Sequence, residues 1–392
     1  MPLSLFALFL STFAIGTTEF IIAGLLPQVS GDLGVSIPTG GFLVTAYAIG
    51  VAIGGPLLSL GLAKLPGRTA LLLLLAVFTL GQVLCAVAPN YATMLAARVL
   101  VAATHGAIFG LGAILATHLV SAERAGRAVS YLLAGVTVAN VLGVPAGAAI
   151  GTALGWRASF WSVGVLGLVA IAAVLLLVPK TEPLAAKPVS LSAQVHVLGR
   201  PVVFLTFLVL IFGMIGQFAL LTYIVPVLHE VSGIDLATVP WLLLCFGVGS
   251  TIGVLVGGRL SDWKTLPALA GILVAQAATY AVIALALGNG LAMSVLMVLW
   301  GAVGFAFGAP AQARILAGAS DAPNLASTLI PSAYNVGIAL GAVAGSLLLG
   351  SGGGYAMLPI IGLAASALAT AVAVVSGIGR HPATSNRQPV TS

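Results

Sequence analysis

The sequence predicts an all-α integral membrane protein with twelve transmembrane helices in two pseudo-symmetric six-helix bundles. The first observation is composition: 60% of the 392 residues are hydrophobic and only 6% are charged. A soluble domain carries about 25% charged residues, so this chain has too few to cover a surface facing water. The second observation is a series of apolar stretches, each near the roughly 20 residues that a spanning helix needs. The third is one long polar join that divides these stretches six and six.

The expected spans are separated by short joins rich in Pro, Gly and charge, such as "LPGR", "APNY" and "SDWK". We expect a first bundle over 1–180, a central cytoplasmic loop over 181–200, a second bundle over 201–379 and a disordered cytoplasmic tail over 380–392. The individual spans are expected near 3–26, 38–60, 69–88, 91–117, 127–153, 157–179, 202–225, 239–261, 267–288, 290–316, 327–350 and 355–378.

The basic residues predict the orientation of these spans. If the N-terminus is inside, then of the 14 Lys and Arg residues Arg157 alone falls in an outside join, and Arg98 lies within a span. This positive-inside bias places both termini in the cytoplasm. It also explains the net charge of +6 through topology and contact with anionic lipid, so we expect no nucleic-acid partner.

The two halves carry matching features, which indicates an internal repeat. The first span ends in "GLLPQV" with Pro27, and the seventh ends in "YIVPVL" with Pro226. Glu19 lies eight residues before Pro27, and Gln217 lies nine before Pro226. Two six-helix halves around a central site are typical of transporters.

Four motifs occur in order along the chain. The first span contains "GTTEF", with Glu19, and ends in "GLLP". The loop after the second span keeps Gly67 and Arg68 of a G-x-x-x-D-R-x-G-R pattern, but Lys64 stands where the pattern has an acid. The fourth span contains "LAARVLVAATHGA", with Arg98, and the fifth reads "GVTVANVLGVPAGAAIG". The loop after the eighth span, "GGRLSDWK", is a second copy of the loop motif.

These motifs resemble those of the twelve-helix drug:proton antiporters of the major facilitator superfamily, over essentially the whole chain to about residue 380. The sequence is most similar to bacterial chloramphenicol-resistance and arabinose-efflux-type exporters. The resemblance implies a proton-coupled exporter in the bacterial inner membrane that works by alternating access. It also implies that the fifth span carries the antiporter motif of exporters, made of Gly135, Gly143, Pro145, Gly147 and Gly151.

The glycines and the proline of the fifth span have a mechanical interpretation. Because glycine has no side chain, neighbouring helices can approach closely, and Pro145 removes a backbone donor and can kink the helix. Together they would let the halves rock while the interface stays closed to protons.

Glu19 is the first candidate for proton coupling. A charged side chain at the centre of a spanning helix costs about 2.5–3.5 kcal/mol, so such residues usually face the bundle interior and serve a function. A carboxyl group away from water binds a proton more readily than one in water. The alternative is that Glu19 pairs with a neighbour and only locks the helices together.

Arg98 and His105, both on the fourth span, are further candidates for proton coupling, and Arg98 is the candidate partner of Glu19. Glu19 and Arg98 each lie about seven residues from the outer end of their spans, so both lie roughly 10 Å below the outer surface. Equal depth allows contact, and the resemblance implies a proton-coupling role for Arg98. His105 is a proton relay, a pocket-lining residue or a helix-packing residue.

Further polar and aromatic residues at membrane depth are candidate substrate contacts. Each has an alternative use in packing or in hydrogen bonds between helices, which is the commoner role of such groups. The candidates are Asn140, Gln217, Tyr47, Trp300 and Thr18.

A cytoplasmic gate is expected where the two loop motifs lie. A salt bridge within the second copy could latch the outward-open state, whereas a solvated loop end without a role is the alternative. The gate candidates are Gly258, Arg259, Asp262, Lys264 and Arg68.

The chain has no G-x-x-x-x-G-K-[ST] sequence and no metal-ligand spacing. We therefore expect no cofactor and no metal, and we expect an ion gradient to supply the energy. The main prediction is a monomeric exporter of small, largely apolar drugs, whose partners are substrate, protons and the lipid bilayer. The first alternative is an exporter of sugars or nucleosides, which would need several convergent polar groups. A non-transporting membrane sensor is a more remote alternative, and an enzyme is not expected because no cluster of catalytic groups is visible.

Overall fold

A computed structural model describes residues 3–62, 64–182 and 197–378 of the chain. Within these ranges eleven helices are long and apolar enough to cross a membrane. One of them, α11 (Val239–Ala286), has 48 residues, or about 72 Å at the usual rise, which is more than twice the thickness of the hydrocarbon core. Its backbone leaves the helical region at Lys264 (φ −153°, ψ 97°), so α11 contains both the eighth and the ninth predicted span. The predicted twelve-span fold class is therefore confirmed.

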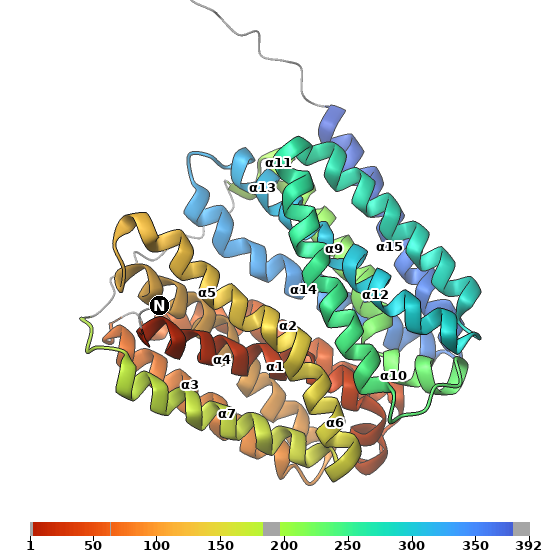
Figure 1. Cartoon of the computed structure of the whole chain (residues 1–392), viewed down its shortest axis with the longest axis horizontal. Helices are drawn as coiled ribbons and strands as arrows, with labels where there is room; N and C mark the ends of the chain where they lie inside the picture. The colour runs from red at the N-terminus through yellow and green to blue at the C-terminus, as the bar shows by residue number, and fades with distance from the viewer. Residues whose placement is uncertain (1–2, 63, 183–196, 379–392) are drawn as a thin grey trace, which may run out of the picture.

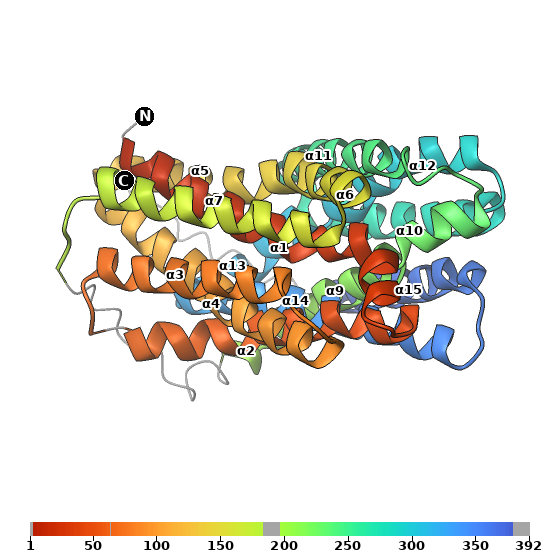
Figure 2. The same ribbon diagram turned by 90° about the horizontal axis from the view of Figure 1, so that it is seen from below.

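The helices form two bundles that Figure 1 shows side by side. The first bundle contains α1 (Leu3–Asp32), α2 (Ile37–Leu62), α3 (Gly67–Ala86), α4 (Tyr91–His118), the short η1 (Ala122–Arg124), α5 (Ala125–Val138), the π-helix η2 (Ala139–Gly143), α6 (Val144–Leu154) and α7 (Trp156–Leu177). The second contains α9 (Pro201–Leu221), α10 (Ile224–Pro226), η3 (Val227–Val231), α11, α12 (Gly290–Ala306), α13 (Gly308–Gly318), α14 (Pro323–Gly350), η4 (Tyr355–Met357) and α15 (Leu358–Ile378). Figure 2 shows that most helices run in roughly the same direction, along the length of the molecule.

The predicted tail over 380–392 and most of the predicted central loop lie outside the described residues. The exact bundle boundaries therefore stay a prediction. On the outer surface, large apolar side chains such as Leu176, Leu285 and Leu291 are at least 80% exposed. A surface of this kind is stable against lipid tails rather than water.

The fifth span is interrupted by a π-helix, and Pro145 explains where. Proline has no backbone N–H, so a continuous α-helix through Pro145 would leave the carbonyl of Val141 without its donor. The chain widens here instead: the N–H of Val144 donates to the carbonyl of Ala139, five residues back. Such single-turn π segments bend a helix and often occur at functional positions.

The motif glycines of the fifth span pack against α1 in the same bundle. A side chain at any of the four would collide with an α1 residue, namely Thr12 for Gly135, Thr17 for Gly143, Ile21 for Gly147 and Leu25 for Gly151. In the other direction, a β-carbon at Gly16 of α1 would lie 2.9 Å from that of Ala139. The motif glycines therefore allow the fifth span and α1 to pack closely within one bundle.

The two bundles contact each other near one end of the molecule. Ser346 of α14 donates a hydrogen bond to the carbonyl of Pro38 of α2 over 2.7 Å. A β-carbon at Gly247 of α11 would lie 2.7 Å from the carbonyl oxygen of Asn140 in η2. In Figure 1 the bundles meet towards the end where α6 and α10 lie, and they diverge towards the end where α14 begins. The joins at the contacting end are those that the charge pattern predicts to be outside.

We predict that Gly253→Ala destabilises the fold whereas Gly258→Ala does not. A β-carbon at Gly253 would collide with the backbone carbonyl of Ala302 in α12, which cannot move aside as a flexible side chain can. At Gly258, five residues along the same helix, nothing lies within 4 Å. Overpacking of this kind costs about 1–3 kcal/mol. Thermal unfolding of the purified protein in detergent would measure it, and equal midpoints for the two variants would contradict the packing of α11 on α12.

Candidate functional site

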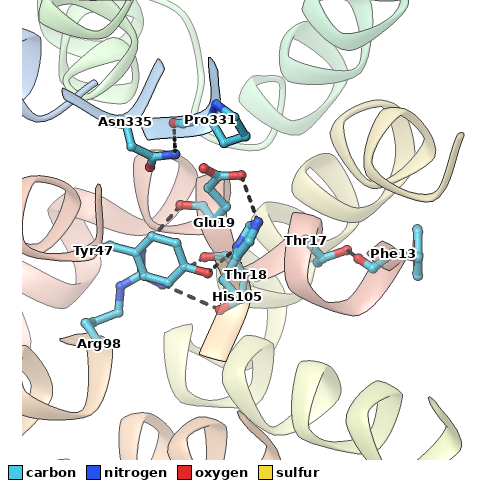
Figure 3. A network of polar contacts seen from close by, with 9 residues as sticks. All are labelled: Phe13, Thr17, Thr18, Glu19, Tyr47, Arg98, His105, Pro331 and Asn335. Atoms are coloured by element: carbon cyan, nitrogen blue, oxygen red, sulfur yellow. Dashed lines mark hydrogen bonds and ion pairs between the residues drawn. The ribbon is translucent and has the colours of Figure 1, made fainter. Parts of the chain in front are cut away.

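Glu19 lies in the middle of α1, and its carboxyl group is inside the first bundle. Its side chain is only 11% exposed. Figure 3 shows it among Tyr47 of α2, Arg98 and His105 of α4, and Asn335 of α14. The Nε2 atom of His105 lies 3.9 Å from the Glu19 carboxylate, within ion-pair range.

Arg98 is fully buried and is held by the backbone of α1. Its guanidinium group donates to the carbonyl of Thr18 over 2.8 Å and to the carbonyl of Glu19 over 3.3 Å. Its central carbon lies 4.0 Å from the centre of the Tyr47 ring, a cation–π contact. The equal depth of Glu19 and Arg98 thus does bring the two residues together. However, Arg98 hydrogen-bonds the main chain of Glu19, and the carboxyl group faces the His105 imidazole, 3.9 Å away.

His105 connects Tyr47 with Glu19. Its Nδ1 atom lies 2.9 Å from the Tyr47 hydroxyl, and its other ring nitrogen faces the carboxylate. Tyr47 and His105 are 2% and 7% exposed, so water has little access to these contacts. The 3.9 Å between Nε2 and the carboxylate is longer than a hydrogen bond, so in this conformation the ring faces Glu19 without bonding to it.

Each bundle contains a buried pair of uncharged polar side chains between two of its helices. Thr18 of α1 and Gln82 of α3 hydrogen-bond each other over 3.0 Å, and Tyr280 of α11 donates to Gln217 of α9 over 3.0 Å. Thr18 lies nine residues before Pro27, as Gln217 does before Pro226. In both bundles a buried polar pair therefore ties the first helix to the third at the same level.

The charged residues of the network have no counterpart at the matching place in the second half. Arg98 lies eight residues after the N-cap Asn90 of α4, and the residue eight after the N-cap Asn289 of α12 is Met297. Both side chains are fully buried. A cation in one half thus corresponds to a thioether in the other, so at this level the buried positive charge lies in the first bundle.

Four of the five predicted substrate contacts lie inside the bundles. Thr18, Tyr47, Gln217 and Trp300 are each at most 2% exposed. Trp300 packs its ring on Phe246, with ring centres 4.8 Å apart. Asn140 is the one of the five that lines the pocket described next.

A small apolar cavity of about 30 Å³, partly open to solvent, lies between the two bundles. Its polar lining residues are Asn140 and Ser250, and four phenylalanines form much of its wall. Phe20 of α1 and Phe218 of α9 approach each other across it, with ring centres 5.5 Å apart. The lining consists of Phe20, Ala23, Asn140, Val144, Phe218, Leu221, Leu243, Phe246, Ser250 and Phe305.

These phenylalanines are not among the residues predicted from the sequence, although one signal points to them. Phe20 directly follows Glu19, and Phe218 directly follows Gln217, so each is the neighbour of a polar residue already singled out. Adjacent residues on a helix point about 100° apart. One can therefore face its own bundle while the next faces the cavity.

The predicted gate residues divide into two groups. Arg68 forms its hydrogen bonds with the end of α7 and the residues after it. Its guanidinium group donates to the carbonyl of Leu175, and its backbone N–H donates to the Thr181 hydroxyl. Arg259, Asp262 and Lys264 are exposed, and the Lys264 ammonium lies 5.1 Å from the centre of the Trp263 ring. Asp262 forms none of the ion pairs found among the described residues. The predicted latch therefore stays a prediction.

The described part of the chain contains no group of three or more His, Cys, Asp and Glu side chains placed to hold a metal ion.

The comparisons with known proteins agree with the fold. The family model of the Major Facilitator Superfamily matches residues 8–342. An inner membrane transport protein of Escherichia coli, YdhP, is 38% identical over 372 residues, which cover 95% of each chain. A chloramphenicol resistance protein of Streptomyces lividans is 34% identical over 352 residues, covering 89% of this chain and 90% of that protein.

A solved structure shares the same architecture. It is a crystal structure of a bacterial homologue of the human lysosomal transporter Spinster, in an inward-facing and occupied conformation. It superposes with a TM-score of 0.72 over 95% of this chain and 94% of that one, at 18% identity. Because the family model spans most of the sequence and two relatives exceed 30% identity over nearly their whole length, the chain belongs to the major facilitator superfamily of membrane transporters.

Proposed function

We propose that this transporter is a proton-coupled exporter of small, uncharged, largely apolar compounds of the chloramphenicol type. The observation that carries the proposal is the position of Glu19 next to Phe20 in the chain. Glu19 belongs to a buried polar network, and Phe20 belongs to the wall of the apolar cavity. A proton site and a substrate site thus adjoin on one helix. The similarity to a chloramphenicol resistance protein supports the choice of substrate class.

The composition of the cavity supports an uncharged substrate. None of its lining residues is charged, so an ionic substrate would lose its hydration there without gaining a counter-charge. Four phenylalanines favour an aromatic ring. A sugar or nucleoside needs several convergent hydrogen-bonding groups, whereas Asn140 and Ser250 supply only two polar side chains. The sugar-exporter alternative is therefore the less supported one.

In the proposed cycle, the carrier releases its substrate outside and Glu19 then takes up a proton from that side. The proton-loaded carrier returns, and Glu19 releases the proton to the cytoplasm. A proton gains about 2.3 kcal/mol over 100 mV, and one pH unit adds about 1.4 kcal/mol. The sum, about 3.7 kcal/mol for one proton, supports a gradient of a few hundredfold for an uncharged substrate.

Two further parts of the proposal concern topology. The excess of Lys and Arg at one side supports cytoplasmic termini in a bacterial inner membrane. With that orientation, the bundles meet at the outer side and diverge at the cytoplasmic side, which corresponds to an inward-facing state.

We expect Glu19→Gln to abolish drug-dependent proton movement, because an amide cannot release a proton. Inverted membrane vesicles with an acidic lumen would be given chloramphenicol, and proton efflux from the lumen would be recorded with a pH-sensitive dye. The matched control is Asp235→Asn, an exposed acid in a loop of the second bundle, which should behave like the wild type. Unchanged proton efflux in Glu19→Gln would contradict the assignment of Glu19 as the proton site.

We expect Phe218→Ala to raise the KM for chloramphenicol about tenfold, which corresponds to about 1.4 kcal/mol of lost ring contact. Phe204→Ala is the control, because Phe204 lies on the same helix but is 48% exposed on its outer face. Uptake of labelled chloramphenicol into inverted vesicles would measure both. Equal KM values, or efficient uptake of a labelled pentose or nucleoside, would argue against the aromatic cavity as the drug site.

A further inference from the structure

Asn335 is a buried polar residue for which none of the contacts above provides a use. It lies on α14 in the second bundle and is 6% exposed. Its amide nitrogen donates to the carbonyl of Pro331, one turn earlier, over 3.0 Å. Its side-chain oxygen is buried and has no hydrogen-bond partner. A buried acceptor without a donor costs about 1–3 kcal/mol, so a native protein rarely keeps one without a reason.

The contact with Pro331 determines which atom of the amide is free. If the amide were turned over, its oxygen would face the carbonyl oxygen of Pro331, and two acceptors repel each other. The nitrogen is therefore committed to the helix of Asn335 itself. The atom left to interact with other residues is an acceptor.

In Figure 3 the Asn335 side chain belongs to the same group of polar side chains as the carboxyl group of Glu19, and it comes from the other bundle. The titratable and charged groups that face this carboxyl are Tyr47 from α2 and Arg98 and His105 from α4, all in the first bundle. Asn335 is the polar side chain that the second bundle contributes to this group in Figure 3. An interaction between Glu19 and Asn335 would thus join the two bundles.

An unpaired acceptor distinguishes the two protonation states of a carboxyl group. The neutral form carries an O–H that can donate a hydrogen bond, whereas the carboxylate only accepts. We propose that Asn335 is a positioning residue for proton coupling, whose side-chain oxygen accepts a hydrogen bond from the protonated carboxyl group of Glu19 and so joins the bundles in this conformation. The inference rests on the proposed function, which makes Glu19 the proton site.

This contact gives the proton a direct effect on the bundle interface. When Glu19 carries its proton, the O–H to Asn335 link stabilises the state in which the bundles meet at the predicted outer end. When the proton leaves to the cytoplasm, two acceptors face each other and the link is lost. The empty site can then bind substrate, and the bundles are free to reopen outwards.

The conformational equilibrium of the full-length protein in lipid nanodiscs tests the inference. Spin labels on Ser130→Cys and Ser320→Cys, both exposed and on different bundles, report by pulsed EPR how far apart the diverging ends lie. The half-buried native thiol is removed by Cys245→Ala, whereas Cys85 is buried and does not react. The fraction of the widely separated form is measured between about pH 5 and about pH 9, on both sides of neutrality.

In the wild type, we expect this fraction to rise as the pH falls. Asn335→Leu keeps the branched shape of the side chain but removes the acceptor, together with the amide donor to Pro331. It should lower the ratio of wide to narrow forms about fivefold at acidic pH, the typical effect of one hydrogen bond, and leave it unchanged at alkaline pH. Glu19→Gln, whose amide always carries a donor, should hold the wide form at every pH. The double variant with Asn335→Leu should lose that stabilisation.

Two results would overturn the inference while leaving the proposed proton site intact. One is an effect of Asn335→Leu that is equal at all pH values, which indicates packing alone. The other is a double variant that matches Glu19→Gln. If instead the wild type shows no dependence on pH and Glu19→Gln changes nothing, then Glu19 is not the proton site, and the proposed function fails together with the inference.

Discussion

The rest of this structure depends on one constraint: in the core of a bilayer no water is present to satisfy a buried polar group. The spanning helices satisfy their own backbones, so each polar side chain must find its partner inside the protein. Arg98 does so through two main-chain carbonyls of α1 and the face of Tyr47. These contacts stabilise the buried cation and offset part of the cost of burying it. They also join α1, α2 and α4 around Glu19.

The two bundles apply this constraint in different ways. Each has a buried polar pair between its first and third helix, Thr18 with Gln82 and Gln217 with Tyr280. The first bundle adds charge at that level, whereas Met297 occupies the equivalent place in the second. In the proposed cycle, this asymmetry makes one bundle respond to protons and leaves the other to recognise that response at the interface.

The fifth span connects the charged network with the contact between the bundles. One face of this span carries the glycines that pack against α1, and the α1 residues they contact lie on either side of Glu19. Its π-helix turns Asn140 towards α11, where Gly247 lies against the Asn140 carbonyl. Small residues on both sides allow close packing, against α1 side chains on one side and against the backbone of α11 on the other. In the proposed cycle, the fifth span is the element that would carry a shift at Glu19 to the neighbouring bundle.

The sequence by itself determined the twelve spans, their six-plus-six division and the residues that matter chemically, because hydropathy is a local property and a charge within a span is conspicuous. Depth along a helix also follows from counting, which is why Arg98 was a candidate partner for Glu19. Only the tertiary structure decided that Arg98 binds the backbone of Glu19, that His105 faces its carboxylate and that phenylalanines line the cavity. The physical reason is that these helices are apolar on nearly every side. Rotating one about its axis leaves its hydropathy unchanged, so the direction in which a side chain points is set by packing against neighbouring helices.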